Sequence, residues 1–375
     1  MITSNEIKPL VVYCLPVYNG EKRIRPCLDS ILSQTHDNIM IVIGDNHSTD
    51  NTWAICQEYA SNYKNIVCTK RHKNNGCYWN YLNLIASLGV LHADYFVFAQ
   101  DDSIFLPTHS ELCVNYLENN INVVSCLTPL IVETHGSRNL KRDNLSTIGL
   151  DICERLKKGI LNDARGLFYT GVHRASAFEN NLDVWFNIST NRLTDLEMLC
   201  HALIRGDIFV LDDALVERSY TDTAMKAYED YNTYLERHHV ANNLRQGITL
   251  PFANGLRKIC QQIFQRKDIQ DINQALTLVN VASETINKMY CNVINQEIER
   301  AISLVQSEKY NEAWYMPNDE IPITAENNKN VKYIFLKNLL RDAIDCDTFL
   351  KNDKLRKLID ICSDKIQSYH IINEK

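Results

Sequence analysis

The chain has 375 residues, of which 45 % are hydrophobic and 23 % are charged, and its net charge is −7 at pH 7. This composition is typical of a folded globular protein and excludes collagen-like, disordered and small disulfide-stabilised classes. The acidic balance argues against nucleic acid as a partner, because phosphate contacts need a basic surface. No hydrophobic run approaches the roughly 20 residues that a membrane-spanning helix needs.

Two further features concern the compartment. Residues 1–8 contain no basic region followed by a hydrophobic stretch, so we expect no secretory signal. The 13 cysteines are odd in number and include no C-x-x-C pair, which favours reduced core residues over a disulfide or zinc framework. These patterns predict a cytoplasmic protein.

The first half of the chain alternates between strand-like and helix-like segments. Continuous hydrophobic runs predict buried strands at residues 10–17, 39–43, 66–68 and 95–99. Helical patterns lie between them, at residues 24–32, from residue 48 onward and at 81–88. Strands that alternate with helices are typical of βαβ units, so we expect a mostly parallel sheet flanked by helices.

The pattern is less regular after Asp102. Residues 123–132 predict one further strand, residues 193–204 a helix and residues 207–212 a late strand. From about residue 225 the chain is helical, with hydrophobic residues at helical spacing that include Leu276, Val279, Leu358 and Cys362. We therefore expect one domain over residues 1–236 and an all-helical C-terminal domain of unknown role over residues 237–375.

A basic stretch opens this C-terminal region. Residues 237–267 contain six Lys or Arg and no Asp or Glu. One interpretation is a surface for anionic lipid or for an anionic substrate carrier, which would give the protein a peripheral membrane contact. The other interpretation is a solvated helix face.

Polar clusters follow three of the predicted strands, at residues 16–20, 45–50 and 100–103. Open parallel sheets bind ligands at the carboxyl ends of their strands. Neither G-x-G-x-x-G nor G-x-x-x-x-G-K-[ST] is present, so phosphate would be held in another way. Carboxylates that hold a divalent cation are one such way, and Asp101–Asp102 suits it; an acidic pair there is otherwise a turn or a helix cap.

Taken together, these motifs resemble a known family. Leu15-Pro-Val-Tyr-Asn-Gly-Glu, Asp45-Asn-His-Ser-Thr-Asp and Phe98-Ala-Gln-Asp-Asp-Ser are similar in order and spacing to family 2 glycosyltransferases of the GT-A fold. Gly171-Val-His-Arg resembles the acceptor-side G-x-x-R of this family, and Thr194-Asp-Leu-Glu its acidic motif before a helix. The resemblance covers roughly residues 9–223 and implies a Rossmann-like sheet in an inverting, nucleotide-sugar-dependent transferase.

The resemblance also implies roles for individual residues. Tyr18 would stack on the base, and Asp45 would accept the imide N–H, which favours uridine. Asp195 would be the general base that deprotonates the acceptor hydroxyl, and Asp102 would hold Mn²⁺ or Mg²⁺ at the diphosphate. The implied nucleotide-binding residues are Pro16, Tyr18, Asn19, Asp45, Asn80 and Asp101, and those on the acceptor or diphosphate side are Gly171, Arg174 and Arg218.

Other interpretations stay open for some of these positions. Thr194 and Glu197 form a capping box, in which Asp195 would stabilise the first helical turn without any part in catalysis. His47 stands where relatives often carry glycine, so we interpret it as a loop residue. His173 is interpreted as a packing or acceptor-side residue.

The expected reaction is the transfer of a single sugar from a UDP-sugar to a hydroxyl of a glycan or lipid-linked acceptor. The Q-x-x-R-W motif and the membrane helices of processive relatives are absent from the sequence. The resemblance implies a role in bacterial surface polysaccharide synthesis at the inner face of the membrane. Two alternatives are a sugar nucleotidyltransferase, whose glycine-rich loop with lysine is missing, and a non-catalytic binding module, which would lack an acidic position.

Overall fold

The computed structural model describes most of the first 220 residues and parts of the remainder. The described residues are 8–74, 77–134, 136–142, 145–161, 165–178, 194–220, 273–281 and 353–373, with isolated positions between 271 and 344. The chain divides into two compact units, Met1–Asp222 with Ile259–Ala282 and Thr223–Lys258 with Ser283–Lys375. Residue 236, where the sequence places a domain boundary, lies outside the described residues.

The first unit is built on a sheet that, within the described residues, has seven strands in the order β10-β6-β9-β4-β1-β2-β3. Its strands are β1 (Val11–Val17), β2 (Ile39–Asp45), β3 (Ile66–Lys70), β4 (Tyr95–Phe98), β6 (Val123–Leu127), β9 (Val172–Arg174) and β10 (Asp207–Val210). All neighbours pair in parallel except β9, which is antiparallel to both β4 and β6. The mostly parallel sheet expected from the sequence is confirmed.

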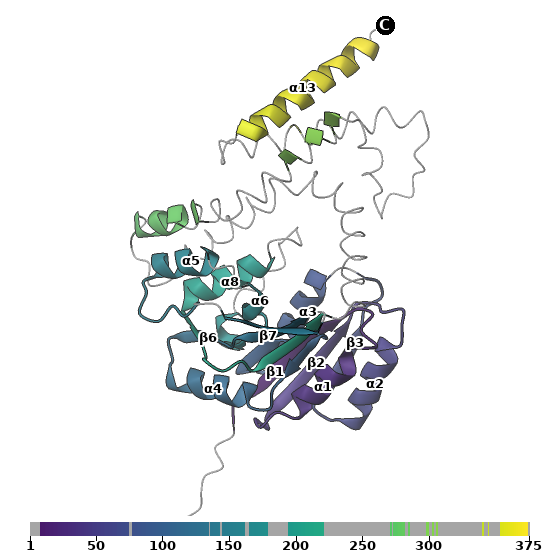
Figure 1. Ribbon diagram of the computed structural model, residues 1–375, viewed down its shortest axis with the longest axis vertical. Helices are drawn as coiled ribbons and strands as arrows, with labels where there is room; N and C mark the ends of the chain where they lie inside the picture. The colour runs from purple at the N-terminus through teal and green to yellow at the C-terminus, as the bar shows by residue number, and fades with distance from the viewer. Residues whose placement is uncertain are drawn as a thin grey trace, which may run out of the picture. The chain divides into compact units, whose positions relative to one another are not determined.

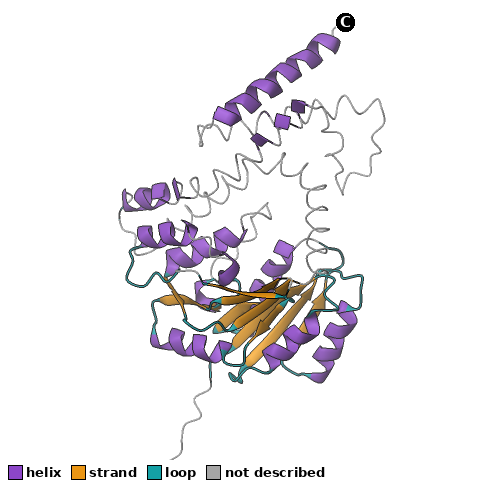
Figure 2. Ribbon diagram, in the orientation of Figure 1, coloured by secondary structure: helices purple, strands orange, loops and turns teal. Residues whose placement is uncertain are grey.

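Helices cover both faces of this sheet (Figures 1 and 2). On one face lie α1 (Ile24–Leu32), α2 (Thr52–Asn62) and α4 (His109–Asn119). On the other lie α3 (Cys77–Leu91), α6 (Arg165–Phe168) and α8 (Thr194–Arg205), and α5 (Ile152–Leu161) packs against α8.

Alternation along the strands sends neighbouring side chains to opposite helix layers. The Tyr13 hydroxyl lies 2.6 Å from Ser110 Oγ of α4, whereas the Phe98 ring packs edge-on against Tyr81 of α3. All four of these residues are at most 8 % exposed, so the core lies on both sides of the sheet.

The single strand predicted over residues 123–132 is wrong, because the chain changes sheet within it. β6 ends at Leu127, and β7 (Leu130–Thr134) belongs to a second sheet of four strands in the order β5-β11-β7-β8. Pro129 stands between them and has no N–H to donate to a strand ladder. The other strands of the second sheet are β5 (Ser103–Phe105), β8 (Ser137–Lys141) and β11 (Val216–Tyr220).

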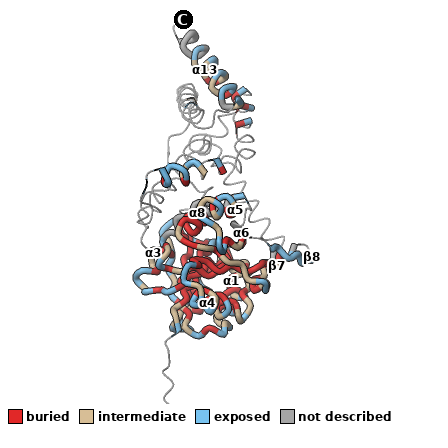
Figure 3. The backbone as a smooth tube through the Cα atoms, turned by 90° about the vertical axis from the view of Figure 1, so that its left-hand side faces the viewer, coloured by how far each residue is buried: buried red, intermediate tan, exposed pale blue. Residues whose placement is uncertain are grey.

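The second sheet ends in an exposed strand. Every residue of β8 is exposed, and Figure 3 shows β8 at the outer end of the β7–β8 hairpin. At the other side of this sheet, β5 follows β4 directly and pairs antiparallel with β11. The sheet therefore connects the end of β4 to the molecular surface.

Residues 273–281 and 353–373 are the two longest continuous helical segments described in the C-terminal region. In residues 273–281 Ala275 and Leu278 are buried, whereas Leu276 is 47 % exposed, so the predicted hydrophobic face is wrong there. In α13 (Asp353–Asn373) Leu358 and Cys362 are buried, as the helical spacing predicts. None of the helices in the described part of the chain is long and hydrophobic enough to span a membrane.

Candidate active site

Three loops meet at the carboxyl edge of the seven-stranded sheet. β1 lies between β2 and β4, with Val17 paired to Asp45 and Cys14 paired to Phe98. The chain runs from β1 to β2 and β3 on one side, then returns to β4 on the other side. The loops after β1 and β4 therefore diverge at a topological switch point, the place where open α/β sheets bind ligands.

Pro16 lies inside β1, and a proline inside a strand normally disrupts the hydrogen bonds to a neighbouring strand. The Cys14 carbonyl accepts a hydrogen bond from the Ala99 N–H at 2.9 Å, so the backbone N–H and C=O groups of every second residue of β1 point toward β4. The backbone of Pro16 is turned to the same side, but β4 ends at Phe98, opposite Cys14. Its missing N–H therefore removes no bond from the ladder.

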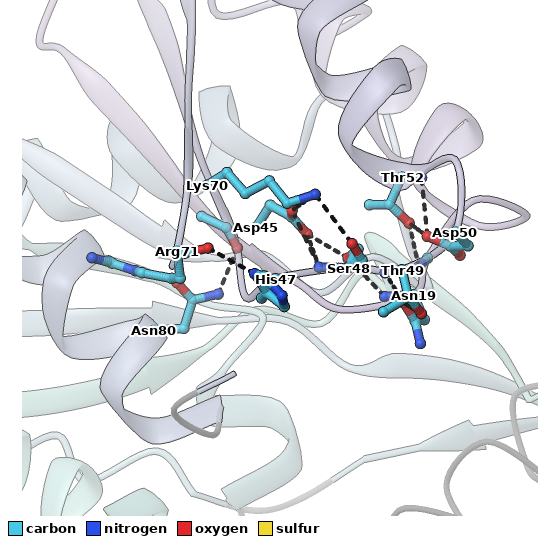
Figure 4. Close-up of polar contacts among 12 residues, drawn as sticks. Asn19, Asp45, His47, Ser48, Thr49, Asp50, Thr52, Lys70, Arg71 and Asn80 are labelled. Carbon is cyan, nitrogen blue, oxygen red and sulfur yellow. Dashed lines mark hydrogen bonds and ion pairs between the residues drawn. The ribbon is translucent and has the colours of Figure 1, made fainter. Parts of the chain in front are cut away.

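The loop after β1 is held by the loop after β2 (Figure 4). The Asn19 N–H donates to Ser48 Oγ at 3.0 Å, and Asn19 Oδ1 accepts a hydrogen bond from the Thr49 N–H at 2.9 Å. Asn19 has φ +48°, a left-handed conformation that asparagine tolerates well. The neighbouring Tyr18 side chain is left 40 % exposed at the edge of the sheet, where a planar ring could stack on it.

Asp45 ends β2 and is completely buried. Its two carboxylate oxygens lie 3.2 and 3.3 Å from the Ser48 N–H, and Oδ1 also accepts a hydrogen bond from Ser48 Oγ. Lys70 Nζ lies 3.8 Å from Oδ2 and donates to the Ser48 carbonyl at 3.1 Å. The carboxylate thus fixes the turn that follows β2. The base of a nucleotide would reach this carboxylate only if the turn opened.

His47 occupies the left-handed region in that turn, with φ +67°. A non-glycine residue is strained there by about 1–2 kcal/mol. The His47 ring lies on the surface, with Nδ1 3.1 Å from the Arg71 carbonyl (Figure 4). These contacts agree with its interpretation as a loop residue.

Asn80 of α3 lies beneath the same strand end. Its side chain is 2 % exposed, and Nδ2 donates to the Gly44 carbonyl at 2.5 Å. A Cβ atom on Gly44 would lie 2.5 Å from Asn80 Oδ1. Glycine at position 44 therefore lets α3 approach the backbone next to Asp45.

The loop after β4 carries Asp101. Its Oδ2 accepts a hydrogen bond from Arg23 Nη2 at 2.7 Å, and its side chain is 18 % exposed. A Cβ on Gly20 would lie 2.3 Å from the same oxygen, so the loop after β1 reaches Asp101 only because residue 20 is glycine. Burial raises the pKa of the Asp101 carboxyl to about 6, although the Arg23 charge opposes the shift.

Asp102 faces Arg218 of the second sheet. Oδ1 of Asp102 lies 3.3 Å from Arg218 Nε, and these side chains are 20 % and 8 % exposed. Antiparallel pairing of β5 and β11 sets Arg218 opposite Ser103, which brings two residues more than a hundred positions apart into contact. The structure thus brings together Asp101, Asp102 and Arg218.

Gly171 and Arg174 lie at opposite ends of β9. Gly171 precedes β9 near the end of β4, where a Cβ would lie 2.2 Å from Leu127 Cδ2. Arg174 is paired with Tyr95 at the start of β4. It donates to the Val123 carbonyl at 2.8 Å and to the Tyr95 hydroxyl at 2.9 Å. The expectation that Arg174 faces the acceptor or diphosphate is therefore corrected: its guanidinium ties strands together at the far edge.

Asp195 lies in the first turn of α8, and its side chain is outside the described residues. The end of α8 leads through Gly206 into Asp207, which is paired with Val123 at the amino edge of the sheet. A helix of 12 residues is about 18 Å long, so its first turn lies toward the carboxyl edge. The position of Asp195 at the start of α8 is thus compatible with a role in the site and equally with the helix-capping role.

Sequence comparisons show to which family the chain belongs. The family model described as Glycosyl transferase family 2 matches residues 13–199. EpsE of Bacillus subtilis is 31 % identical over 240 residues, covering 59 % of this chain and 81 % of that protein. The chain belongs to glycosyl transferase family 2. An uncharacterized glycosyltransferase of Rickettsia typhi is 28 % identical over 245 residues, which cover 61 % of this chain and 71 % of the relative.

The solved structures that resemble this glycosyltransferase support its fold. TarS of S. aureus, residues 1–349 in complex with UDP, has a TM-score of 0.54 at 14 % identity, covering 96 % of this chain and 91 % of TarS. The complex of TarS with UDP-GlcNAc has a TM-score of 0.55 at 15 % identity, covering 97 % and 92 %. These matches confirm the predicted GT-A fold class, and the family confirms a transferase.

The site fits a metal ion that is held jointly with substrate. Among the described residues, no three His, Cys, Asp or Glu side chains form a group that could hold a metal on its own. Mg²⁺ is typically bound by one or two carboxylates together with substrate phosphates. Asp102 Oδ1 is buried without a hydrogen-bond partner in the described part of the chain. This carboxylate oxygen faces Arg218 and keeps acceptor capacity, which suits a cation whose other ligands are diphosphate oxygens and water.

Sequence reasoning missed Arg23 and Lys70, which touch Asp101 and Asp45. Arg23 is 78 positions away from Asp101 in the chain, and no spacing rule connects them. Lys70 ends β3, in register with Asp45, so the parallel order of β2 and β3 could have suggested this contact. The signal for Arg23 lies only in the folded arrangement of α1 and β4.

Proposed function

We propose that the protein is an inverting glycosyltransferase that moves one sugar from a UDP-sugar to a hydroxyl of a glycan or lipid-linked acceptor. The observation that carries the proposal is the meeting of Asp45, Asp101 and Asp102 at the carboxyl edge, around the switch point of the sheet. The crystal complexes of TarS with UDP and UDP-GlcNAc support a uridine nucleotide donor for this fold.

The nucleoside would lie across the loops after β1, β2 and β4. Tyr18, whose ring is exposed, stacks on the base, and Asp45 accepts the uracil N–H once the 46–49 turn opens. Asn19 joins this turn to the loop after β1 through its hydrogen bonds to Ser48 and Thr49. The Asp101 carboxylate, next to this loop, accepts hydrogen bonds from the ribose hydroxyls.

The diphosphate would lie over the junction of the two sheets. Asp102 holds a divalent cation, Mn²⁺ or Mg²⁺, which when bound neutralises charge on the departing diphosphate. The Arg218 guanidinium beside Asp102 stabilises the same charge through its own N–H donors.

Asp195 completes the mechanism at the start of α8. Its carboxylate takes the proton of the acceptor hydroxyl as that oxygen attacks the anomeric carbon opposite the leaving diphosphate. One displacement by one nucleophile inverts the configuration. The helix N-terminus favours the ionised carboxylate, which is the form able to accept the proton. Gly171 lies at the acceptor side of the site.

We place this reaction in bacterial surface polysaccharide synthesis at the inner face of the membrane. A relative, the dTDP-rhamnosyl transferase RfbG of Shigella flexneri, is 33 % identical over 114 residues, which cover 30 % of this chain and 39 % of RfbG. The donor of this relative makes dTDP-sugars the second donor class to test.

A donor screen tests the proposal. Purified protein is mixed with UDP-, GDP- and dTDP-sugars, with Mn²⁺ or Mg²⁺ and a mixture of glycan acceptors, and released nucleoside diphosphate is measured. We expect release of UDP that depends on the cation, and a product anomer opposite to that of the donor. Exclusive use of a GDP- or dTDP-sugar would contradict the uridine assignment, and retained configuration would contradict inversion.

A further inference from the structure

Arg23 lies between the two loops that meet at the switch point. It precedes α1, and its Nη2 donates to Asp101 Oδ2 at 2.7 Å and to the Asn19 carbonyl at 3.3 Å. The Arg23 and Asp101 side chains are 20 % and 18 % exposed, so water screens this ion pair only in part. One guanidinium thus joins the loop after β1 to the loop after β4.

The Asp101 carboxylate is also confined sterically. Gly20 approaches Oδ2 so closely that a Cβ there would lie 2.3 Å from this oxygen. Below the same loop, Cys27 Sγ of α1 donates to the Gln100 carbonyl at 3.3 Å. The Asp101 carboxylate is therefore confined by the loop after β1, and the backbone of its own loop is held by α1.

We propose that Arg23 is a positioning residue that aims the Asp101 carboxylate at the ribose of the donor nucleotide. A guanidinium bond to one carboxylate oxygen fixes the plane of the group and directs its remaining acceptor capacity outward. The inference rests on the proposed binding of a uridine nucleotide at this edge. Arg23 itself acts through Asp101 and makes discrimination between ribose and deoxyribose possible.

The test measures affinities of the full-length protein for UDP, 2′-deoxy-UDP and 3′-deoxy-UDP by calorimetry with Mn²⁺ present. The variants are Arg23→Gln, Arg23→Lys and the control Arg25→Gln, whose arginine lies in α1 and pairs on the surface with Glu58 of α2. We expect the wild type to prefer UDP over at least one deoxy analogue by about tenfold, since a hydrogen bond to a charged group is removed.

In Arg23→Gln we expect UDP affinity to fall about tenfold and the preference over the deoxy analogue to shrink below about threefold. Arg23→Lys keeps the charge and should recover part of both effects, whereas Arg25→Gln should match the wild type.

Equal loss of affinity for UDP and for both deoxy analogues in Arg23→Gln would overturn the inference, because a merely structural arginine predicts that result. Unchanged affinities would overturn it as well. If thermal unfolding shows that Arg23→Gln does not fold, Arg23→Lys decides between the same two outcomes. A wild type that binds no UDP would instead refute the proposed function, and the inference with it.

Discussion

Asp102 and Arg218 form a contact whose value for stability is small. Removing two charges from water costs free energy that their attraction only offsets when further hydrogen bonds are made. Here Arg218 Nε lies 3.3 Å from Asp102 Oδ1, yet this oxygen is among the buried atoms without a hydrogen bond in the described residues. We therefore interpret this contact as part of the diphosphate site that we propose.

Substitutions of two aspartates separate donor binding from catalysis. We expect Asp102→Asn to weaken donor binding in Mn²⁺ by about tenfold or more, because a metal-bound carboxylate is lost. We expect Asp195→Asn to lower turnover by about 10²- to 10⁴-fold, the usual contribution of a general base, and to leave UDP affinity nearly unchanged. Calorimetry and UDP release measure the two effects.

Asp37→Asn is the matched control, because Asp37 is 77 % exposed and pairs only with Lys8 among the described residues. It should behave as the wild type in both measurements. An Asp195→Asn enzyme with full turnover would contradict the base assignment and leave the helix-capping role.

At the scale of elements, the contact between α3 and β2 determines how close a helix comes to the site. Gly44 lies in the buried strand β2 just before Asp45, and Asn80 of α3 donates to its carbonyl. The space between the two residues is smaller than a methyl group. The helix therefore depends on glycine at position 44 and asparagine at position 80 together.

A double-mutant cycle tests this dependence. We expect Gly44→Ala to lower the free energy of unfolding by about 1–3 kcal/mol, because its methyl group would lie 2.5 Å from Asn80 Oδ1. Adding Asn80→Ala should relieve the clash, with a coupling of about 0.5–3 kcal/mol between the two sites. Urea denaturation measures each value.

Gly89→Ala is the control on the same helix, since nothing lies within 4 Å of a Cβ there. It should stabilise the protein by about 0.5–1 kcal/mol through helix propensity. Additive effects of Gly44→Ala and Asn80→Ala would show that the two side chains do not compete for space.

For the whole molecule, buried ionisable groups predict how stability depends on pH. Burial lowers the pKa of His109 to about 4 and that of His173 to about 3, while burial raises that of Asp101 to about 6. Both histidines are fully buried and hydrogen-bonded. His109 bonds to the Thr170 carbonyl, and His173 bonds to the Ser125 hydroxyl and the Phe168 carbonyl. His173 is thus a packing residue in the core.

The signs of these shifts oppose one another. Each histidine binds its proton more readily in the unfolded chain, so its contribution is present above about pH 6.5 and declines as pH falls toward its folded pKa. The Asp101 carboxyl binds its proton more readily in the folded chain, so it adds stability as pH falls below about 6.

From these three groups we expect a loss of about 1.4 kcal/mol per pH unit between pH 6 and 4, the slope of one uncompensated histidine. Asp101→Asn should steepen this slope to about twice that value, because two histidines then act alone. Urea denaturation at half-unit pH intervals measures both slopes. A slope that Asp101→Asn does not change would contradict the raised pKa of Asp101.

Much of the fold follows from local sequence pattern. The runs at residues 10–17 and 39–43 are hydrophobic throughout because β1 and β2 are covered on both faces, and such runs indicate buried strands directly. The second sheet could not be predicted, because β8 is a short polar strand, fully exposed, that is stabilised by its pairing with β7. Pro129 was the available signal that residues 123–132 contain two strands.

The candidate site follows the same division. Tyr18, Asp45 and Asp102 lie directly after hydrophobic strands, so the rule for parallel sheets brings them to one edge. Gly171 and Arg174 belong to the same family motif. Gly171 precedes the three-residue strand β9 and Arg174 ends it, which takes the arginine to the far edge of the sheet. Contacts such as Arg23 with Asp101 depend on side-chain reach between distant segments, which sequence spacing does not encode.

The most direct measurement is a crystal structure of the protein soaked with UDP and Mn²⁺. We expect the uracil ring against Tyr18, the ribose at Asp101, and a manganese ion between Asp102 and the diphosphate. Nucleotide bound elsewhere, or manganese held by residues other than Asp102, would contradict this expectation.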